Sequence, residues 1–168
     1  RFFAGIPNIP KQAKDKMAIY SLFLQHIIFS LSKKGKAAVV VPTGFITAQA
    51  GIDKKIREKL VESKMLAGVV SMPSNIFATT GTNVSIVFMD KTNKGNVVLI
   101  DASNLGETVK DGKNQKTVLT AKEEQQIIDT FNSKVALEDF SVVVSYDEIK
   151  QQNYSLSAGQ YFEVKIEY

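Results

Sequence analysis

Lys36-Ala-Ala-Val-Val-Val-Pro-Thr-Gly-Phe-Ile-Thr-Ala-Gln49 is the stretch of sequence that decides the fold. Residues 37–41 form an unbroken apolar run, bounded by Gly35 and Pro42. Such a run predicts a strand that is buried on both faces of a parallel sheet. Ligands bind outside the carboxyl ends of the strands in sheets of this kind. We therefore expect a cleft beside the loop 42–49.

Length and composition indicate a single domain. The chain has 168 residues, of which 44% are hydrophobic, and this is enough for one buried core. It has no cysteine, which excludes disulfides and thiolate chemistry and is compatible with the cytoplasm. No apolar run approaches the roughly 20 residues of a membrane span. Because the sequence begins at Arg1 without a methionine, we expect it to be a piece of a longer protein.

The charge pattern favours contact with a phosphate backbone over reading of bases. The net charge is +4, and only Arg1 and Arg57 among the 21 basic residues are arginines. Lysine binds phosphate as a point charge, whereas bidentate recognition of guanine favours arginine. A lysine-rich, solvated surface explains the same composition without any nucleic acid.

Periodicity and capping signals predict the order of the elements. Helical spacing of apolar residues predicts helices over 16–34, mostly buried, and over 51–63. A capping box opens a short helix at Thr120, and a second capping box at Ser145 opens at most a short turn. The remaining apolar runs predict strands over 65–72, 84–90, 96–101 and, at an edge, 142–144. Residues 102–119 are polar and are expected to form an exposed loop. Local turn chemistry at 93–95 favours a hairpin between strands 84–90 and 96–101.

No catalytic constellation stands out from residue types and spacing alone. His26 lies among apolar residues with no partner for catalysis or zinc binding, and Asp53, Glu58 and Glu62 fall on a solvated helix face. Asp101 ends a strand, where an acid either caps a turn or binds a ligand. The loop 79–83 could present amides to phosphate, but it has the spacing of no nucleotide-binding motif.

Phe77 is the most informative of the candidate site residues. It is a large aromatic residue in the polar loop 74–83, beside the expected cleft. Such a side chain could stack on a base that has left a DNA duplex. Its other interpretation is a hydrophobic anchor that pins the loop to the core.

Several segments together carry a family resemblance. The chain resembles the M subunit of type I restriction–modification systems, the adenine-N6 DNA methyltransferases. The segments that carry this resemblance occur in the family's order and cover most of the chain: 37–46 (AAVVVPTGFI), 56–60 (IREKL), 71–77 (SMPSNIF), 80–91 (TGTNVSIVFMDK), 99–103 (LIDAS) and 153–161 (NYSLSAGQY).

The resemblance implies an α/β fold, the C-terminal half of a class I S-adenosylmethionine-dependent methyltransferase fold (Rossmann-like, three-layer α/β/α, with a mixed sheet). In that topology strand 84–90 is antiparallel and lies between strands 37–41 and 65–72, and strand 96–101 joins at an edge. We expect this order in place of the local hairpin. A catalytic-domain portion would cover 1–145 and a C-terminal extension 146–168.

The resemblance also assigns the chemistry to residues outside this sequence. The family's catalytic Asn-Pro-Pro-Phe motif, which holds the adenine amino group against the methyl donor, is absent and is expected upstream of Arg1. The main motif for the cofactor, S-adenosyl-L-methionine, is absent as well. Residues 7–10, Pro-Asn-Ile-Pro, do not match the catalytic motif. We expect no catalytic residue and no metal ligand in this chain, and no methyl transfer by the chain alone.

The part played by this chain is then the target-base side of the cleft. The resemblance implies base or cleft contacts by Phe77, Pro42, Thr43, Gly44 and Phe45. It implies DNA-backbone contacts by Lys54, Lys55, Thr80, Thr82 and Asn83. The partners would be DNA and the specificity (S) and restriction (R) subunits, with no membrane.

Two further expectations concern association and an alternative function. A chain cut through a sheet exposes an unpaired strand edge beside residues 37–41, so we expect it to self-associate. The alternative function is a non-catalytic α/β module that binds nucleic acid through lysines, or a protein through an apolar face.

Overall fold

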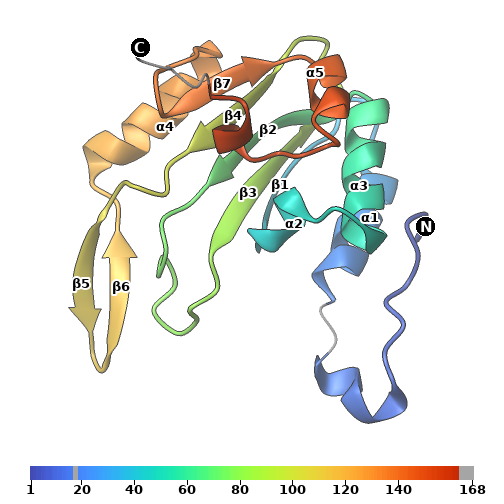
Figure 1. Ribbon diagram of the computed structural model, residues 1–168, viewed down its shortest axis with the longest axis horizontal. Coiled ribbons are helices and arrows are strands. Elements are labelled where there is room, and N and C mark those ends of the chain that lie inside the picture. The colour runs from blue at the N-terminus through green and yellow to red at the C-terminus, as the bar shows by residue number, and fades with distance from the viewer. Residues whose placement is uncertain (17–18, 163–168) are drawn as a thin grey trace, which may run out of the picture.

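The computed structural model describes residues 1–16 and 19–162. Figure 1 shows the arrangement of its elements. In chain order they are η1 (Lys11–Lys16), α1 (Tyr20–Ser30), β1 (Lys36–Pro42), α2 (Gly44–Thr47), α3 (Gly51–Glu62), β2 (Leu66–Ser71), β3 (Val84–Asp90), β4 (Val97–Asp101), β5 (Glu107–Asp111), β6 (Asn114–Val118), α4 (Ala121–Ser133), β7 (Ser141–Val144), α5 (Tyr146–Gln151) and η2 (Ala158–Gln160).

A mixed five-stranded sheet of order β1-β3-β2-β4-β7 forms the centre of the fold. Strand β3 is antiparallel to both β1 and β2, β4 is parallel to β2, and β7 pairs antiparallel with β4. The predicted position of strand 84–90 and the edge strand at 142–144 are therefore confirmed. The local hairpin is wrong because β3 uses both of its edges on β1 and β2. The prediction that strand 96–101 joins at an edge is also wrong, because β4 lies between β2 and β7.

Helices cover the sheet on both faces and give the expected three layers. The larger core lies under α1, α3 and α5, with Leu24, Ile56 and Ile149 among its buried side chains. A smaller core lies under α4, where the Phe131 and Phe88 rings are 4.6 Å apart. Helix α4 comes so close to β2 that a Cβ on Gly68 would lie 2.5 Å from the Phe131 ring. Glycine is therefore required there.

The structure corrects the predicted loop at 102–119. Residues 107–118 form a separate two-stranded hairpin, β5–β6, in which Asp111 pairs with Asn114. Gly112 takes the first turn position with φ of 61°, a conformation that glycine adopts without strain. The Asp-Gly pair was the sequence signal for this turn.

Burial of the first helix and first strand is smaller than predicted. Helix α1 covers Tyr20–Ser30, shorter than the predicted 16–34, of which residues 17 and 18 lie outside the described residues. Its Phe23 and Phe29 side chains are exposed, so the prediction that this helix is mostly buried is wrong. Strand β1 is not buried on both faces either, since Val40 is 49% exposed.

Strand β1 forms one edge of the sheet, as the resemblance implied. It pairs with β3 along its whole length, and no other strand of the described chain pairs with it. Its free edge and the exposed apolar side chains of α1 leave a large uncovered surface on this side of the molecule.

We expect this free edge to make the chain self-associate, because an open strand is a template for pairing with another chain. Light scattering should detect dimers or larger species. Val40→Lys should shift the distribution toward monomer, since a charge on an exposed edge strand opposes pairing. A monomeric unmodified chain at high concentration would contradict the expectation. Lys64→Asn, a change of an exposed residue outside β1, serves as the control.

Candidate functional site

A polar cavity lies at the carboxyl edge of the sheet, where the sequence placed the cleft. Strands β1, β2 and β4 run in the same direction and end together at this edge. The cavity has a volume of about 410 Å³. Its polar lining comes from the ends of all three strands, the loop before β3 and the C-terminal tail, and includes Thr43, Thr47, Ser71, Asn83, Asp101 and Ser157.

The two loops beside the cavity are tied to each other. The Thr43 amide donates to the Asn83 carbonyl oxygen at 2.8 Å. The Thr43 and Ser85 hydroxyl oxygens are 3.0 Å apart and share a hydrogen bond. The wall formed by residues 43–48 therefore keeps a fixed position relative to the start of β3.

Arg57 of α3 holds this wall by hydrogen bonds to its backbone. Its side chain is 0% exposed on α3. Its guanidinium donates to the carbonyl oxygens of Phe45 at 2.6 Å and of Tyr154 at 2.8 Å, and also to that of Ala48. Burial lowers the Arg57 pKa, while the charges of Asp53 and Glu58 oppose that shift. Because an arginine stays protonated in proteins, a buried cation on α3 joins two other segments of backbone, the wall 43–48 and the C-terminal tail.

The helix pattern predicted a solvated carboxylate at Asp53, but the structure gives this carboxylate a hydrogen-bond partner on α1. Its Oδ2 accepts a hydrogen bond of 2.7 Å from the Tyr20 hydroxyl in a partly buried position. Burial, followed by this bond, raises the pKa of Tyr20 well above its usual value. Tyr20 stays neutral and links α1 to the turn of α3 that precedes Arg57.

The C-terminal tail is fastened to the same wall and forms part of the cavity. The Leu156 amide donates to the Ile46 carbonyl at 3.0 Å, and the Lys54 ammonium group donates to Asn153 Oδ1 at 2.9 Å. These bonds bring Ser157 and Gly159 to the cavity lining. Sequence reasoning missed this role, although the family-like segment 153–161 was the signal for it. The predicted boundary between residues 145 and 146 stays a prediction. Both α5 and the tail contribute to the main core.

The structure places some of the predicted cleft residues beside the cavity and one of them, Phe45, in the core. Pro42 ends β1, and Thr43 and Gly44 follow it at the cavity edge. The Phe45 side chain is 0% exposed and packs edge-on to the Tyr20 ring, at 6.3 Å between centroids. Phe45 therefore supports the wall from the core, and the prediction that its side chain lines the cleft is wrong.

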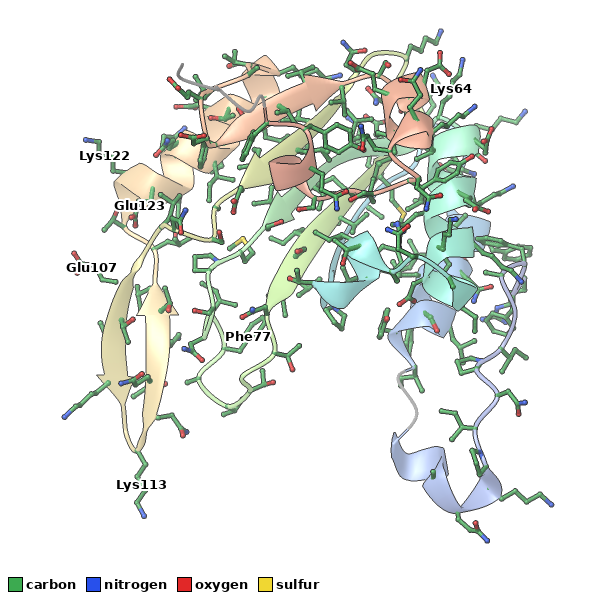
Figure 2. The ribbon with its side chains drawn as sticks, viewed as in Figure 1. Lys64, Phe77, Glu107, Lys113, Lys122 and Glu123 are labelled. Atoms are coloured by element: carbon green, nitrogen blue, oxygen red, sulfur yellow. The ribbon has the colours of Figure 1, made fainter. Side chains whose placement is uncertain are left out.

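The predicted DNA contacts are not brought together in one group. Phe77 is 48% exposed on the loop 74–83, which also carries Thr80 and Thr82. Figure 2 shows the position of Phe77 on this loop. Lys54 and Lys55 lie on α3, well apart from the loop in Figure 1, and the Lys54 ammonium group is engaged by the tail.

The remaining polar candidates have identifiable structural partners. Asp101 Oδ1 accepts from the amide and hydroxyl of Ser103, at 3.0 and 2.5 Å, while Asp101 also lines the cavity. The interpretation as a turn cap is confirmed, and ligand binding by Asp101 stays a prediction. His26 Nδ1 accepts from Arg1 Nε at 3.1 Å. Among the described residues no group of three acidic or histidine side chains could hold a metal ion.

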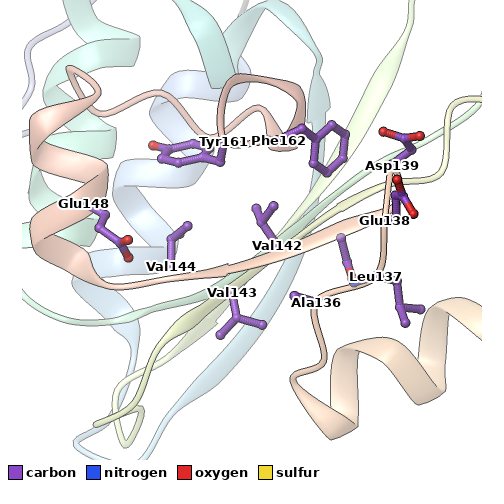
Figure 3. A pocket seen from close by; sticks show the side chains of 11 residues that line it. Ala136, Leu137, Glu138, Asp139, Val142, Val143, Val144, Glu148, Tyr161 and Phe162 are labelled. Atoms are coloured by element: carbon purple, nitrogen blue, oxygen red, sulfur yellow. The ribbon is translucent and has the colours of Figure 1, made fainter. Parts of the chain in front are cut away.

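A larger cavity, of about 610 Å³, lies along β7, the strand at the other end of the sheet from β1 (Figure 3). Its lining combines the outer edge of β7 with Tyr161, Phe162 and the carboxylates of Asp139 and Glu148. It is lined by the length of β7 and not by the ends of β1, β2 and β4, where sheets of this kind bind ligands. The smaller polar cavity is therefore the better candidate site.

Comparison with known proteins gives a consistent family. The profile of the N-6 DNA methylase family matches residues 1–167. The MpnII type I methylase subunit of Mycoplasma pneumoniae is 34% identical over 147 residues, which are 86% of this chain and 26% of that subunit. The MjaIX subunit of Methanocaldococcus jannaschii is 30% identical over an alignment of 158 positions that covers 87% of this chain and 28% of that subunit.

Solved structures agree in fold. The methyltransferase subunit of a type I restriction-modification system from Streptococcus thermophilus superposes with a TM-score of 0.76 and 26% identity, covering 88% of this chain and 30% of that one. The EcoKI M protein superposes with a TM-score of 0.58 at 22% identity, covering 83% and 36%, and supports the fold alone. The chain thus spans between a quarter and two fifths of the length of these proteins.

We expect Arg57→Met to lower the free energy of unfolding by about 3–5 kcal/mol, because three buried carbonyls lose their donor. Arg57→Lys keeps the charge without the fork of donors and should lose less. Lys55→Met, an exposed change on the same helix, should stay within about 0.5 kcal/mol of the parent. Urea unfolding followed by circular dichroism measures all three. Equal stability of the Met variant and the parent would contradict the role given to Arg57.

Proposed function

The chain belongs to the N-6 DNA methylase family, and from this membership we propose that it is part of the M subunit of a type I restriction–modification system. That subunit is an adenine-specific DNA N6-methyltransferase that uses S-adenosyl-L-methionine. The chain supplies the target-base side of the cleft. Its similarity over most of its length to type I methylase subunits supports this assignment.

One observation carries the assignment of the cleft. The polar cavity at the carboxyl ends of β1, β2 and β4 coincides with the position where α/β sheets bind ligands. It is bounded by Ser74 and Asn83, the two ends of the loop that carries the exposed Phe77. A half-exposed aromatic side chain beside a polar cavity suits a base that has left its duplex.

The cavity chemistry fits a base better than a phosphate. Its lining offers hydroxyl and amide groups, which pair with the polar edges of a base. The carboxylate of Asp101 adds a negative charge that repels phosphate. Phe77 would provide the stacking surface, and the wall 43–48 would keep the base in place while the amino group reacts.

The residues present do not fit the cofactor. The residues that follow the three parallel strands are Thr43-Gly44, Met72-Pro73 and Ala102-Ser103. Only the first pair leads directly into a helix, the four-residue α2, and it contains a single glycine, so none of them is the glycine-rich turn of a cofactor site. When bound to the enzyme, S-adenosyl-L-methionine supplies the methyl group. We assign its binding, and the Asn-Pro-Pro-Phe chemistry, to no residue of this chain.

The proposal extends to partners, location and domain organisation. DNA and the specificity and restriction subunits are the partners, the location is the cytoplasm, and residues 1–145 and 146–168 are the catalytic portion and its extension. No helix in the described ranges is long and apolar enough to cross a membrane.

Methyl transfer tests this function directly. The reading frame that contains this chain, expressed with its specificity subunit, should transfer tritiated methyl groups from S-adenosyl-L-methionine to adenine N6 in DNA. The 168-residue chain alone should transfer none. A reading frame without this activity, combined with DNA binding by the chain alone, would favour the non-catalytic binding module.

Phe77→Ala in that methyltransferase should lower kcat/KM for DNA by about 10- to 100-fold, because stacking on a base contributes about 1–3 kcal/mol. Phe77→Tyr keeps an aromatic ring and should restore most of the rate. Fluorescence of 2-aminopurine at the target position reports the stacking. Since Phe77 is half exposed, thermal unfolding should change little. Unchanged kinetics and fluorescence in the Ala variant would remove Phe77 from the site.

A further inference from the structure

We propose that the hairpin β5–β6 is a DNA-backbone contact that places lysines on the phosphates flanking the base site. The sequence predicted only an exposed loop in this region, and no contact was assigned to it. The inference rests on the proposed function, since it requires that the cleft receives DNA.

The hairpin projects from the same edge of the sheet as the loop that carries Phe77. It follows β4, whose end lines the cavity, and it lies beside the loop 74–83 in Figure 1. The Thr117 amide of β6 donates to the Asn75 carbonyl of that loop at 2.8 Å. A duplex whose base reaches Phe77 therefore passes within reach of the hairpin.

The surface of the hairpin is not needed by the core. All five residues of β5 are exposed, and in β6 only Thr117 is buried. An isolated two-stranded hairpin is at best marginally stable, so its order depends on attachments at its base. A strand of five residues spans about 17 Å, and a two-stranded ribbon is narrow enough to enter the major groove of DNA.

The charge of the hairpin complements the loop beside it. Residues 74–83 contain no charged side chain, so the loop offers a stacking surface without any counter-charge for phosphate. Residues 107–118 carry Lys110, Lys113 and Lys116 against two acids, Glu107 at the base of the hairpin and Asp111 beside its turn. Lys113 lies at the tip (Figure 2). Lysine without arginine suits contact with phosphates and not reading of bases.

The register distributes these lysines over both faces of the ribbon. Lys110 pairs with Gln115, and Lys116 pairs with Val109. Because side chains alternate along a strand, Lys110 and Lys116 point to opposite faces. A ribbon in a groove has a phosphate backbone on each side, so one lysine on each face and one at the tip match that environment.

The base of the hairpin is fixed in direction by α4. The Glu123 carboxylate accepts from the Gly106 amide at 3.0 Å and from the Thr120 amide at 2.8 Å. Gly106 adopts φ of 89°, which favours glycine, as the chain turns into β5. Together with the bond between Thr117 and Asn75, these contacts hold the projecting strands beside the Phe77 loop.

The test removes the three hairpin lysines from the methyltransferase encoded by the full reading frame. The variant carries Lys110→Gln, Lys113→Gln and Lys116→Gln. Its matched control carries Lys33→Gln, Lys64→Asn and Lys94→Gln, which removes three exposed lysines at the opposite, amino edge of the parallel strands. Fluorescence anisotropy measures DNA affinity from low to moderate salt. Isothermal titration measures binding of S-adenosyl-L-methionine.

The hairpin variant should bind DNA about tenfold more weakly, and its slope of log affinity against log salt should fall by about 2–3, which is close to one unit per lost phosphate contact. Cofactor affinity should be unchanged, and the control should keep the parent slope. Equal slopes for the parent and the hairpin variant overturn the inference, as does an equal loss in the control. Loss of subunit assembly with DNA affinity intact identifies a protein contact and also overturns it. A parent protein that binds no DNA overturns the proposed function itself.

Discussion

The guanidinium of Arg57 is the interaction on which the geometry of the cleft depends. It is fully buried and donates to the carbonyl oxygens of Phe45 and Ala48 in the wall 43–48 and of Tyr154 in the tail, two segments that lie outside the sheet. A buried cation is tolerated only when its donors are satisfied. This arrangement is therefore strongly favoured over alternatives, because moving either the wall or the tail leaves a charged donor and a carbonyl without their hydrogen-bond partners. The wall of the cleft and the tail behave as one unit.

The sheet topology explains why a cleft exists at this edge. Strand β3 runs antiparallel between β1 and β2, so those two strands end at the same edge while a full strand width separates them. The connections 43–50 and 72–83 leave from this edge, and the cavity lies between their starting points. The same insertion leaves β1 with a free edge, at which the side chain of Val40 is exposed. One topological feature thus produces both the site and the open side of the molecule.

The sequence predicted features whose causes are local and failed where the causes are distant. The helices after Thr120 and Ser145 begin at their capping boxes, because each cap is closed within four residues. Arg57 looked like one more charged residue on α3, since its partner Tyr154 lies 97 positions away. Phe45 was placed in the cleft because its neighbours line it, but helix α2 turns that side chain into the core. The hairpin was missed for another reason: β5 shows no apolar alternation, so its Asp-Gly turn was the only signal.

A division of tasks among the surface elements follows from their chemistry. The loop 74–83 combines an exposed aromatic ring with no charge, the cavity combines hydroxyls with the carboxylate of Asp101, and the hairpin carries the lysines. A cation inside the cavity would attract phosphate to the proposed base site, whereas a cation on a separate projection attracts phosphate without competing. The bond from Thr117 to Asn75 links the projection to the loop. The hairpin lysines and the aromatic ring of Phe77 thus belong to two elements that are joined by a backbone hydrogen bond.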